Sequence, residues 1–88
     1  RGNMMNIEII RKKNSHQIIA KVNDDYVLIS ESGPEVSSTV SYPETLAFLC
    51  DSDGNVSSWT EVAGGSMMQI SDVLVEISQY GINKKGAF

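Results

Sequence analysis

Eighty-eight residues, of which 41% are apolar, suffice for a single domain over 1–88 and exclude a second hydrophobic core. No uninterrupted apolar run is longer than five residues, so we expect no membrane-spanning segment. The net charge of −4 is unevenly spread: the span 22–83 holds ten of the eleven acids and none of the seven Lys and Arg residues. We expect residues 1–4 to be an expression remnant and 83–88 a frayed tail.

Three strands joined by two short turns are expected in the first third of the chain. The stretch 5–12 alternates apolar and polar residues, which is typical of a half-buried strand. Strands at 16–22 and 26–30 should follow turns at 13–15 and 23–25, because the Asn, Ser and Asp residues there favour tight reversals. The stretch 26–30 is apolar on both faces, so we expect it inside the sheet, in a meander.

The next segment allows two interpretations. The stretch 31–35 contains Gly33-Pro34 and is expected to be a loop, followed by a short strand at 36–42 that Pro43 ends. The stretch 42–50 could be a helix with Pro43 at its first position. We favour a strand, because the apolar run is short and ends directly at an Asp-Gly turn.

A β-hairpin over 45–63 is the clearest local pattern. The apolar run 46–50 meets Asp53-Gly54, and Val56 and Trp59 follow. Asp-Gly between two such runs is a strong hairpin indicator, since Gly tolerates a positive φ and Asp bonds its own backbone. The hairpin holds the only Trp and the only Cys, so we expect it to form the centre of the sheet, with Trp59 largely buried.

An amphipathic helix is expected between 66 and 80. One apolar stripe at i, i+3, i+4 and i+7 supports it, formed by Ile70, Val73, Leu74 and Ile77.

Both ends of this helix carry recognisable capping residues. Either Ser66 or Ser71 could be the N-cap. At the other end, Gly81 is expected in the left-handed conformation, with Ile82 folding back on Ile77.

Together these elements predict an α+β domain: an antiparallel sheet of five or six strands, meander plus hairpin, with one C-terminal amphipathic helix packed on one face. One helix cannot cover a five-stranded sheet, so we expect a homodimer. Its contacts should be the leftover apolar positions, which are Ile10, Val27, Ile29 and Val40.

Residues for catalysis or metal binding are few. Cys50 and His16 are the only candidates for nucleophile and base, and one of each is too few for a zinc site. The run 51–55 resembles a calcium loop, but Gly54 stands at position 4 instead of 6 and Val62 replaces the Glu at position 12. The stretch 64–66 lacks the rest of a phosphate-binding fingerprint. We therefore expect no metal, no cofactor and no enzymatic activity.

Direct nucleic-acid binding is not expected either, because the basic cluster is small and the rest of the chain is acidic. That cluster is formed by Arg11, Lys12, Lys13 and Lys21. A single cysteine fits a reducing compartment such as the cytoplasm.

The hairpin also carries a resemblance. Its residues are Glu44-Thr45-Leu46-Ala47-Phe48, then Asp51, Asp53-Gly54, Val56, Trp59 and Glu61. This pattern resembles one found in small uncharacterised proteins of bacteriophages and other bacterial mobile elements, such as gene cassettes. The resemblance implies a bacterial accessory protein, and it transfers no functional residue because those proteins have no settled activity.

Two functions follow as hypotheses. The first is a non-enzymatic, acidic protein-interaction module that docks a host protein with a basic surface. Its expected contacts are the acids Glu31, Glu35, Asp51, Asp53 and Glu61. The alternative is a small-ligand-binding protein or enzyme with a pocket between sheet and helix near Trp59, Glu61 and Tyr80, where a buried Glu61 would have a raised pKa.

Overall fold

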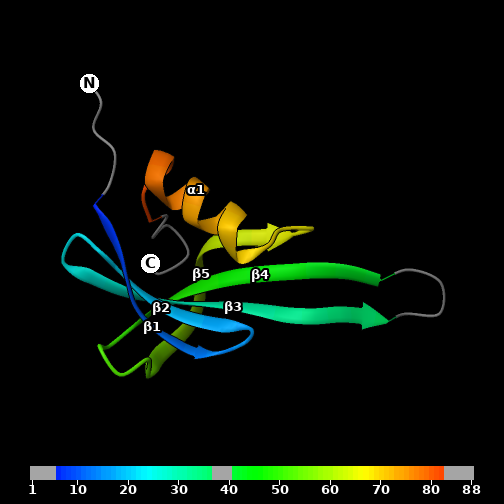
Figure 1. Ribbon diagram of the computed structural model, residues 1–88, viewed down its shortest axis with the longest axis horizontal. Helices are drawn as coiled ribbons and strands as arrows, with labels where there is room; N and C mark the ends of the chain where they lie inside the picture. The colour runs from blue at the N-terminus through cyan, green and yellow to red at the C-terminus, as the bar shows by residue number, and fades with distance from the viewer. Residues whose placement is uncertain (1–5, 37–40, 83–88) are drawn as a thin grey trace.

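The computed structural model describes residues 6–36 and 41–82, with the backbone alone for 32–36 and 41–43. It shows one antiparallel sheet with one helix on one face (Figure 1). The elements are β1 (Ile7–Asn14), β2 (Gln17–Val22), β3 (Asp25–Val36), β4 (Ser41–Cys50), β5 (Val56–Ser66) and α1 (Ile70–Tyr80). The predicted α+β class and the meander are confirmed, with five strands. The predicted remnant at 1–4, the tail at 83–88 and the dimer contact at Val40 lie outside the described residues.

The centre of the sheet is β3. The strand order β1-β2-β3-β4-β5 places β5 at an edge, so the prediction that the 45–63 hairpin forms the centre is wrong. Val27, Leu28 and Ile29 are at most 2% exposed, as the predicted internal strand requires. Turn chemistry specifies which two strands pair, but not what lies on their outer sides, and this is why the hairpin pattern was misleading.

Strands β3 and β4 are longer than expected and pair as far as Val36 and Ser41. The predicted loop at 31–35 is instead part of β3, and Gly33-Pro34 fall where the register shifts between residues 32 and 35. An irregularity of this kind tolerates a proline that cannot donate to the ladder. Of the predicted strand at 36–42, Val36 belongs to β3 and residues 41 and 42 belong to β4, while 37–40 lie outside the described residues. The strand interpretation of 42–50 is confirmed, although Pro43 lies inside β4 and does not end it.

The main core lies between the sheet and α1. Val73 and Ile77 of the predicted stripe are fully buried, and Ile70 and Leu74 pack against the same cluster. The buried members are Ile18, Ala20, Val22, Val27, Ile29, Ala47, Val62, Ala63, Val73 and Ile77. Burying each of the large aliphatic side chains contributes roughly 1.5–3 kcal/mol. Two of the predicted dimer contacts, Val27 and Ile29, are fully buried in this core, so that part of the dimer prediction is wrong.

The first turn of α1 is capped by neither serine. Gln69 is the N-cap, and its backbone N–H donates to Asp72 Oδ2 at 2.9 Å. Ser66 ends β5 and Ser71 lies inside the first turn, so both predicted caps are wrong. The hydroxyl of Thr45 donates to the backbone oxygen of Met68 at 2.6 Å and ties the connection between β5 and α1 to the sheet. Asp72 is also placed where a negative charge favours the helix dipole.

The C-terminal end of α1 follows the prediction more closely. Gly81 has φ 77° and ψ −172°, and its N–H donates to the carbonyl of Ile77 at 2.8 Å. The positive φ is confirmed, whereas ψ is extended and not left-handed helical. Ile82 packs against the core cluster that contains Ile77.

Candidate interaction surface

The sheet face opposite α1, which we call the open face, carries a second set of buried apolar residues. Ile19, Leu28 and Phe48 are cross-strand neighbours on β2, β3 and β4. They are 0%, 2% and 8% exposed, although α1 packs on the other side of the sheet (Figure 1). The chain must therefore cover this face with something other than the helix.

Part of that cover is the turn between β4 and β5, residues 51–55, which we call the hairpin tip. Asp51 Oδ1 accepts hydrogen bonds from the N–H groups of Asp53 and Asn55, both at 2.9 Å. Gly54 is buried, has φ 88°, and leaves so little room that an added Cβ would lie 2.7 Å from Ile19 Cδ1. The predicted Asp-Gly turn is confirmed, and its glycine also permits the tip to lie against Ile19.

The hairpin tip meets the basic strand β1. Arg11 Nη2 donates to the backbone oxygen of Asp53 at 3.1 Å across 42 residues of sequence. The Lys13 ammonium lies beside Gly54. Asp51 and Asp53 are exposed, as the docking hypothesis assumed. Arg11 and Lys13 of the same chain lie close to the hairpin tip, however, and this weakens the field that these acids offer to a partner.

The predicted nucleophile and base are not brought together. His16 is 62% exposed, and its Nδ1 lies 3.6 Å from Glu31 Oε1. The residue next to it, Gln17, pairs with Ser30 of β3, whereas Cys50 pairs with Tyr26 of the same strand. Ser30 and Tyr26 are four residues apart on β3, so the positions of His16 and Cys50 are separated by about 14 Å along the strand.

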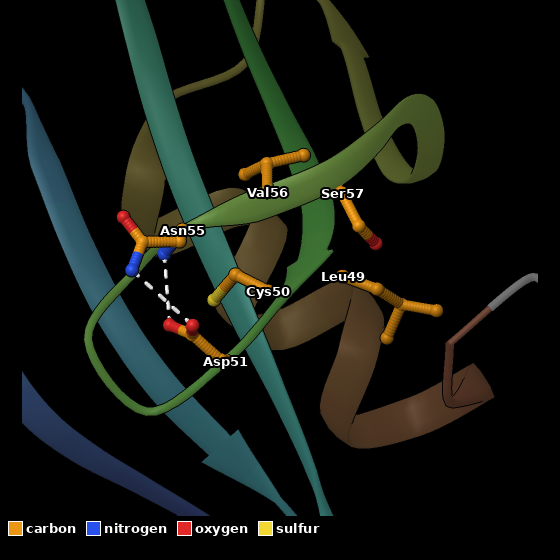
Figure 2. A pocket seen from close by; sticks show the side chains of 6 residues that line it. All are labelled: Leu49, Cys50, Asp51, Asn55, Val56 and Ser57. Carbon is orange, nitrogen blue, oxygen red and sulfur yellow. Dashed lines mark hydrogen bonds between the residues drawn. The ribbon is translucent and has the colours of Figure 1, made fainter.

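A pocket of about 340 Å³ opens where β4 leaves the sheet for the hairpin tip (Figure 2). We call it the neck pocket; its lining is Leu49, Cys50, Asp51, Asn55, Val56 and Ser57. Burial, and then the Asp51 carboxylate, raises the pKa of the Cys50 thiol, and the Lys13 ammonium offsets part of that rise. A raised pKa keeps the thiol protonated at neutral pH and makes it a poor nucleophile. Across residues 6–36 and 41–82, no three His, Cys, Asp or Glu side chains gather as a metal site would require.

Trp59 is 68% exposed, so the prediction that it is largely buried is wrong. Phe48 and Cys50 are two residues apart on β4, whereas their partners on β5, Glu61 and Val56, are five residues apart. The stretch 57–60 therefore bulges out of the regular ladder, and bulges redirect side chains. The Trp59 ring nevertheless meets the Phe48 ring edge to face, with centroids 4.9 Å apart.

Glu61 lies on the same face as Trp59. Glu61 is the cross-strand partner of Phe48, and the Trp59 ring contacts the Phe48 ring. Glu61 and Trp59 therefore both flank Phe48 on the open face. Glu61 is exposed, and within the described residues its carboxylate makes neither a hydrogen bond nor an ion pair. We call Trp59 and Glu61 the Trp–Glu pair.

The other predicted docking acids lie elsewhere. Glu31 forms an ion pair with His16, and the backbone of Glu35, which pairs with Tyr42 of β4, lies still further along β3 from the hairpin tip. Cys50, which precedes the hairpin tip, pairs with Tyr26, and Glu31 is five residues further along β3. Glu31 is therefore about 17 Å from that end of the β3–β4 ladder. The four predicted docking acids whose side chains the structure describes therefore form no single patch.

The predicted pocket between sheet and helix is not assembled from its three residues either. Trp59 and Glu61 are on the open face, while Tyr80 is 81% exposed at the end of α1, on the other side of the sheet. The sequence does contain the pattern that predicts an exposed Trp59. Its neighbours two residues away are Ser57 and Glu61, so that face of the strand is polar.

Comparisons with protein-family models, curated proteins and solved structures find no match for this chain. In the described part of the chain, no helix combines the length and the apolar character needed to cross a membrane.

Proposed function

We propose that this protein is a non-enzymatic protein-interaction module that docks a basic partner on its open face, with Trp59 as the anchor. The observation that carries the proposal is the exposure of the only Trp, 68%, above a Phe48 that is 8% exposed. Tryptophan is among the residues most enriched at the energetic centres of protein interfaces. An indole held against a buried ring loses little freedom on docking, which favours binding.

The charge around Trp59 supports a basic partner. Strand β5, which carries Trp59, contains Glu61 on the same face and has no Lys or Arg. Among the described residues there are four Lys and Arg: Arg11, Lys12 and Lys13 lie on β1 and Lys21 lies on β2, toward the opposite edge of the sheet from β5. Such a field attracts a positively charged surface and makes the association rate depend on salt.

The partner is proposed to be a bacterial host protein. The resemblance of residues 44–61 to proteins of bacteriophages and gene cassettes supports that source. The free Cys50 is compatible with a reducing cytoplasm, where we place the interaction.

Affinity capture from a bacterial lysate tests this function, with the wild-type chain, Trp59→Ser and Tyr80→Ser as baits at low and high salt. Tyr80 is the matched control, because it is also a largely exposed aromatic residue and lies on another element. We expect a protein that wild type and Tyr80→Ser retain at low salt, and that Trp59→Ser loses. Identical captured sets for wild type and Trp59→Ser would contradict the proposal.

Small-ligand binding is the second candidate, and the neck pocket is the observation that favours it. Its volume of about 340 Å³ is within the range of small-molecule sites, and its lining combines Leu49 and Val56 with the polar groups of Asp51 and Asn55. A ligand bound there would raise the melting temperature of wild type. The same compound should not raise that of Ser57→Tyr, whose larger side chain fills the pocket.

A further inference from the structure

The Trp–Glu pair has the chemistry of a receptor for one cationic side chain. Trp59 offers a largely exposed indole, and Glu61 offers a carboxylate without a partner among the described residues. Both flank Phe48, Glu61 as its cross-strand partner and Trp59 through the ring contact. That arrangement suits a planar cation that lies against the indole and turns its edge to the carboxylate.

The site is also held in shape before any partner arrives. The Phe48 ring fixes the indole from below, at 4.9 Å and 70°. The hydroxyls of Ser58 and Thr60, on either side of Trp59 in the sequence, are hydrogen-bonded to each other at 3.0 Å. These contacts stiffen the bulge that carries Trp59.

None of the cations that the structure describes is placed to fill this site. On the open face, Arg11 donates to Asp53, and Lys21 lies over the Tyr26 ring at 5.8 Å. Between residues 22 and 83 the sequence has no further Lys or Arg. Lys13 lies beside Gly54, so the described cations on this face are all at other places.

The partner presents a side chain and does not add a strand. The N–H of Gly64 on β5 donates to Glu76 Oε1 of α1 at 3.1 Å, so the helix already uses that part of the edge. The stretch 57–60 is out of register, which is a known way to block strand addition. A loop or a flexible tail can still reach the Trp–Glu pair.

We propose that the Trp–Glu pair binds an arginine side chain of the basic partner, with the guanidinium stacked on Trp59 and hydrogen-bonded to Glu61. Arginine fits better than lysine, because its planar group stacks on aromatic rings and can bond both carboxylate oxygens at once. An ammonium is more strongly hydrated and cannot do both. This inference rests on the proposed function and names the group recognised.

The test uses the full chain and three capped peptides of sequence Gly-Ser-X-Gly-Ser-X-Gly-Ser, with X as arginine, lysine or citrulline. Citrulline keeps the shape of arginine and removes its charge. Binding is followed at low salt by calorimetry and by the emission of Trp59, the only Trp. We expect the arginine peptide to bind several-fold more tightly than the lysine peptide, and the citrulline peptide at least about tenfold more weakly than the arginine peptide.

Two charge-matched variants complete the test. Glu61→Gln should weaken the arginine peptide about tenfold. Glu8→Gln changes net charge equally, and Glu8 lies on β1 at the other edge of the sheet, so it should leave binding nearly unchanged. Equal losses for both variants, equal affinity for arginine and citrulline, or no binding of any peptide would overturn the inference. The proposed function would still stand in those cases if capture depended on Trp59.

Discussion

The indole of Trp59 meets the ring of Phe48 edge to face, with centroids 4.9 Å apart and planes at 70°. Phe48 is 8% exposed and Trp59 is 68% exposed, so one ring belongs to the packed interior and the other to the surface. An aromatic pair in this geometry contributes about 0.5–1.5 kcal/mol. The contact therefore positions Trp59 and adds little to the core.

The two rings should behave differently when they are truncated. Phe48→Ala should lower the free energy of unfolding by about 3–5 kcal/mol, because it leaves a cavity in a small domain. Trp59→Ala should lower it by only about 1 kcal/mol, the order of the ring contact. Urea denaturation followed by circular dichroism measures both. A Trp59→Ala chain that is as destabilised as Phe48→Ala would show that the indole is part of the core.

Gly81 should resist substitution. At φ 77° and ψ −172° its backbone occupies a region that is essentially restricted to glycine. We expect Gly81→Ala to cost about 1–3 kcal/mol of unfolding free energy. Gln79→Ala is the control, because Gln79 is exposed in the last turn of α1 and should change stability by less than about 0.5 kcal/mol. Equal urea midpoints for both variants would rule out the strained conformation.

Acid should loosen the hairpin tip. The N–H of Asn55, and then its side-chain amide, donate to Asp51 and hold the pKa of that carboxyl below its ordinary value. The stabilisation is therefore fully present above the ordinary pKa of about 4 and is lost as the pH falls through the lower folded-state pKa.

Urea midpoints measured from neutral to strongly acidic pH test this dependence. Asp51→Asn should be less stable than wild type at neutral pH and should decline less on acidification. Asp53→Asn should follow the wild-type curve, because Asp53 contacts Arg11 through its backbone oxygen. Parallel curves for wild type and Asp51→Asn would mean that this carboxylate does not hold the turn.

Self-association is expected through the β1 edge and should rise with salt. Ile9 and Ile10 are 56% and 42% exposed there, beside Arg11, Lys12 and Lys13. A two-fold contact buries the isoleucines but brings like charges together, and salt screens that repulsion. Light scattering at high protein concentration should show a dimer at high salt that Ile9→Ser removes. A monomer mass at every salt concentration would contradict this expectation. It would also contradict the predicted dimer contact at Ile10, which the structure leaves exposed.

Local patterns were sufficient for most of the elements. The Asp53-Gly54 turn and the apolar stripe of α1 each depend on neighbouring residues, and each is confirmed. Alternation over 5–12 correctly predicted a strand, but β1 is exposed along most of its length, so the expected half-burial is wrong. Gly33-Pro34 misled because pairing with β4 carries β3 past residues that usually end a strand. Tertiary pairing overrides local preference in this way.

Trp59 shows why the candidate surface was harder to predict. Size alone favours burial of a tryptophan, and its burial depends on whether the strand keeps register with its neighbour. The bulge at 57–60 arises from pairing with β4 and has no local turn pattern of its own. The polar neighbours Ser57 and Glu61 pointed to exposure and were outweighed by the apolar character of Trp59.

The central claim is that the folded protein presents its only tryptophan to the solvent, and fluorescence of the wild-type chain tests it most directly. We expect an emission maximum close to that of free tryptophan in water, and quenching by acrylamide almost as efficient in the native state as in urea. A blue-shifted emission with strong protection from acrylamide in the native state would contradict the claim. Trp59 would then belong to the core, and the docking surface proposed around it would be lost.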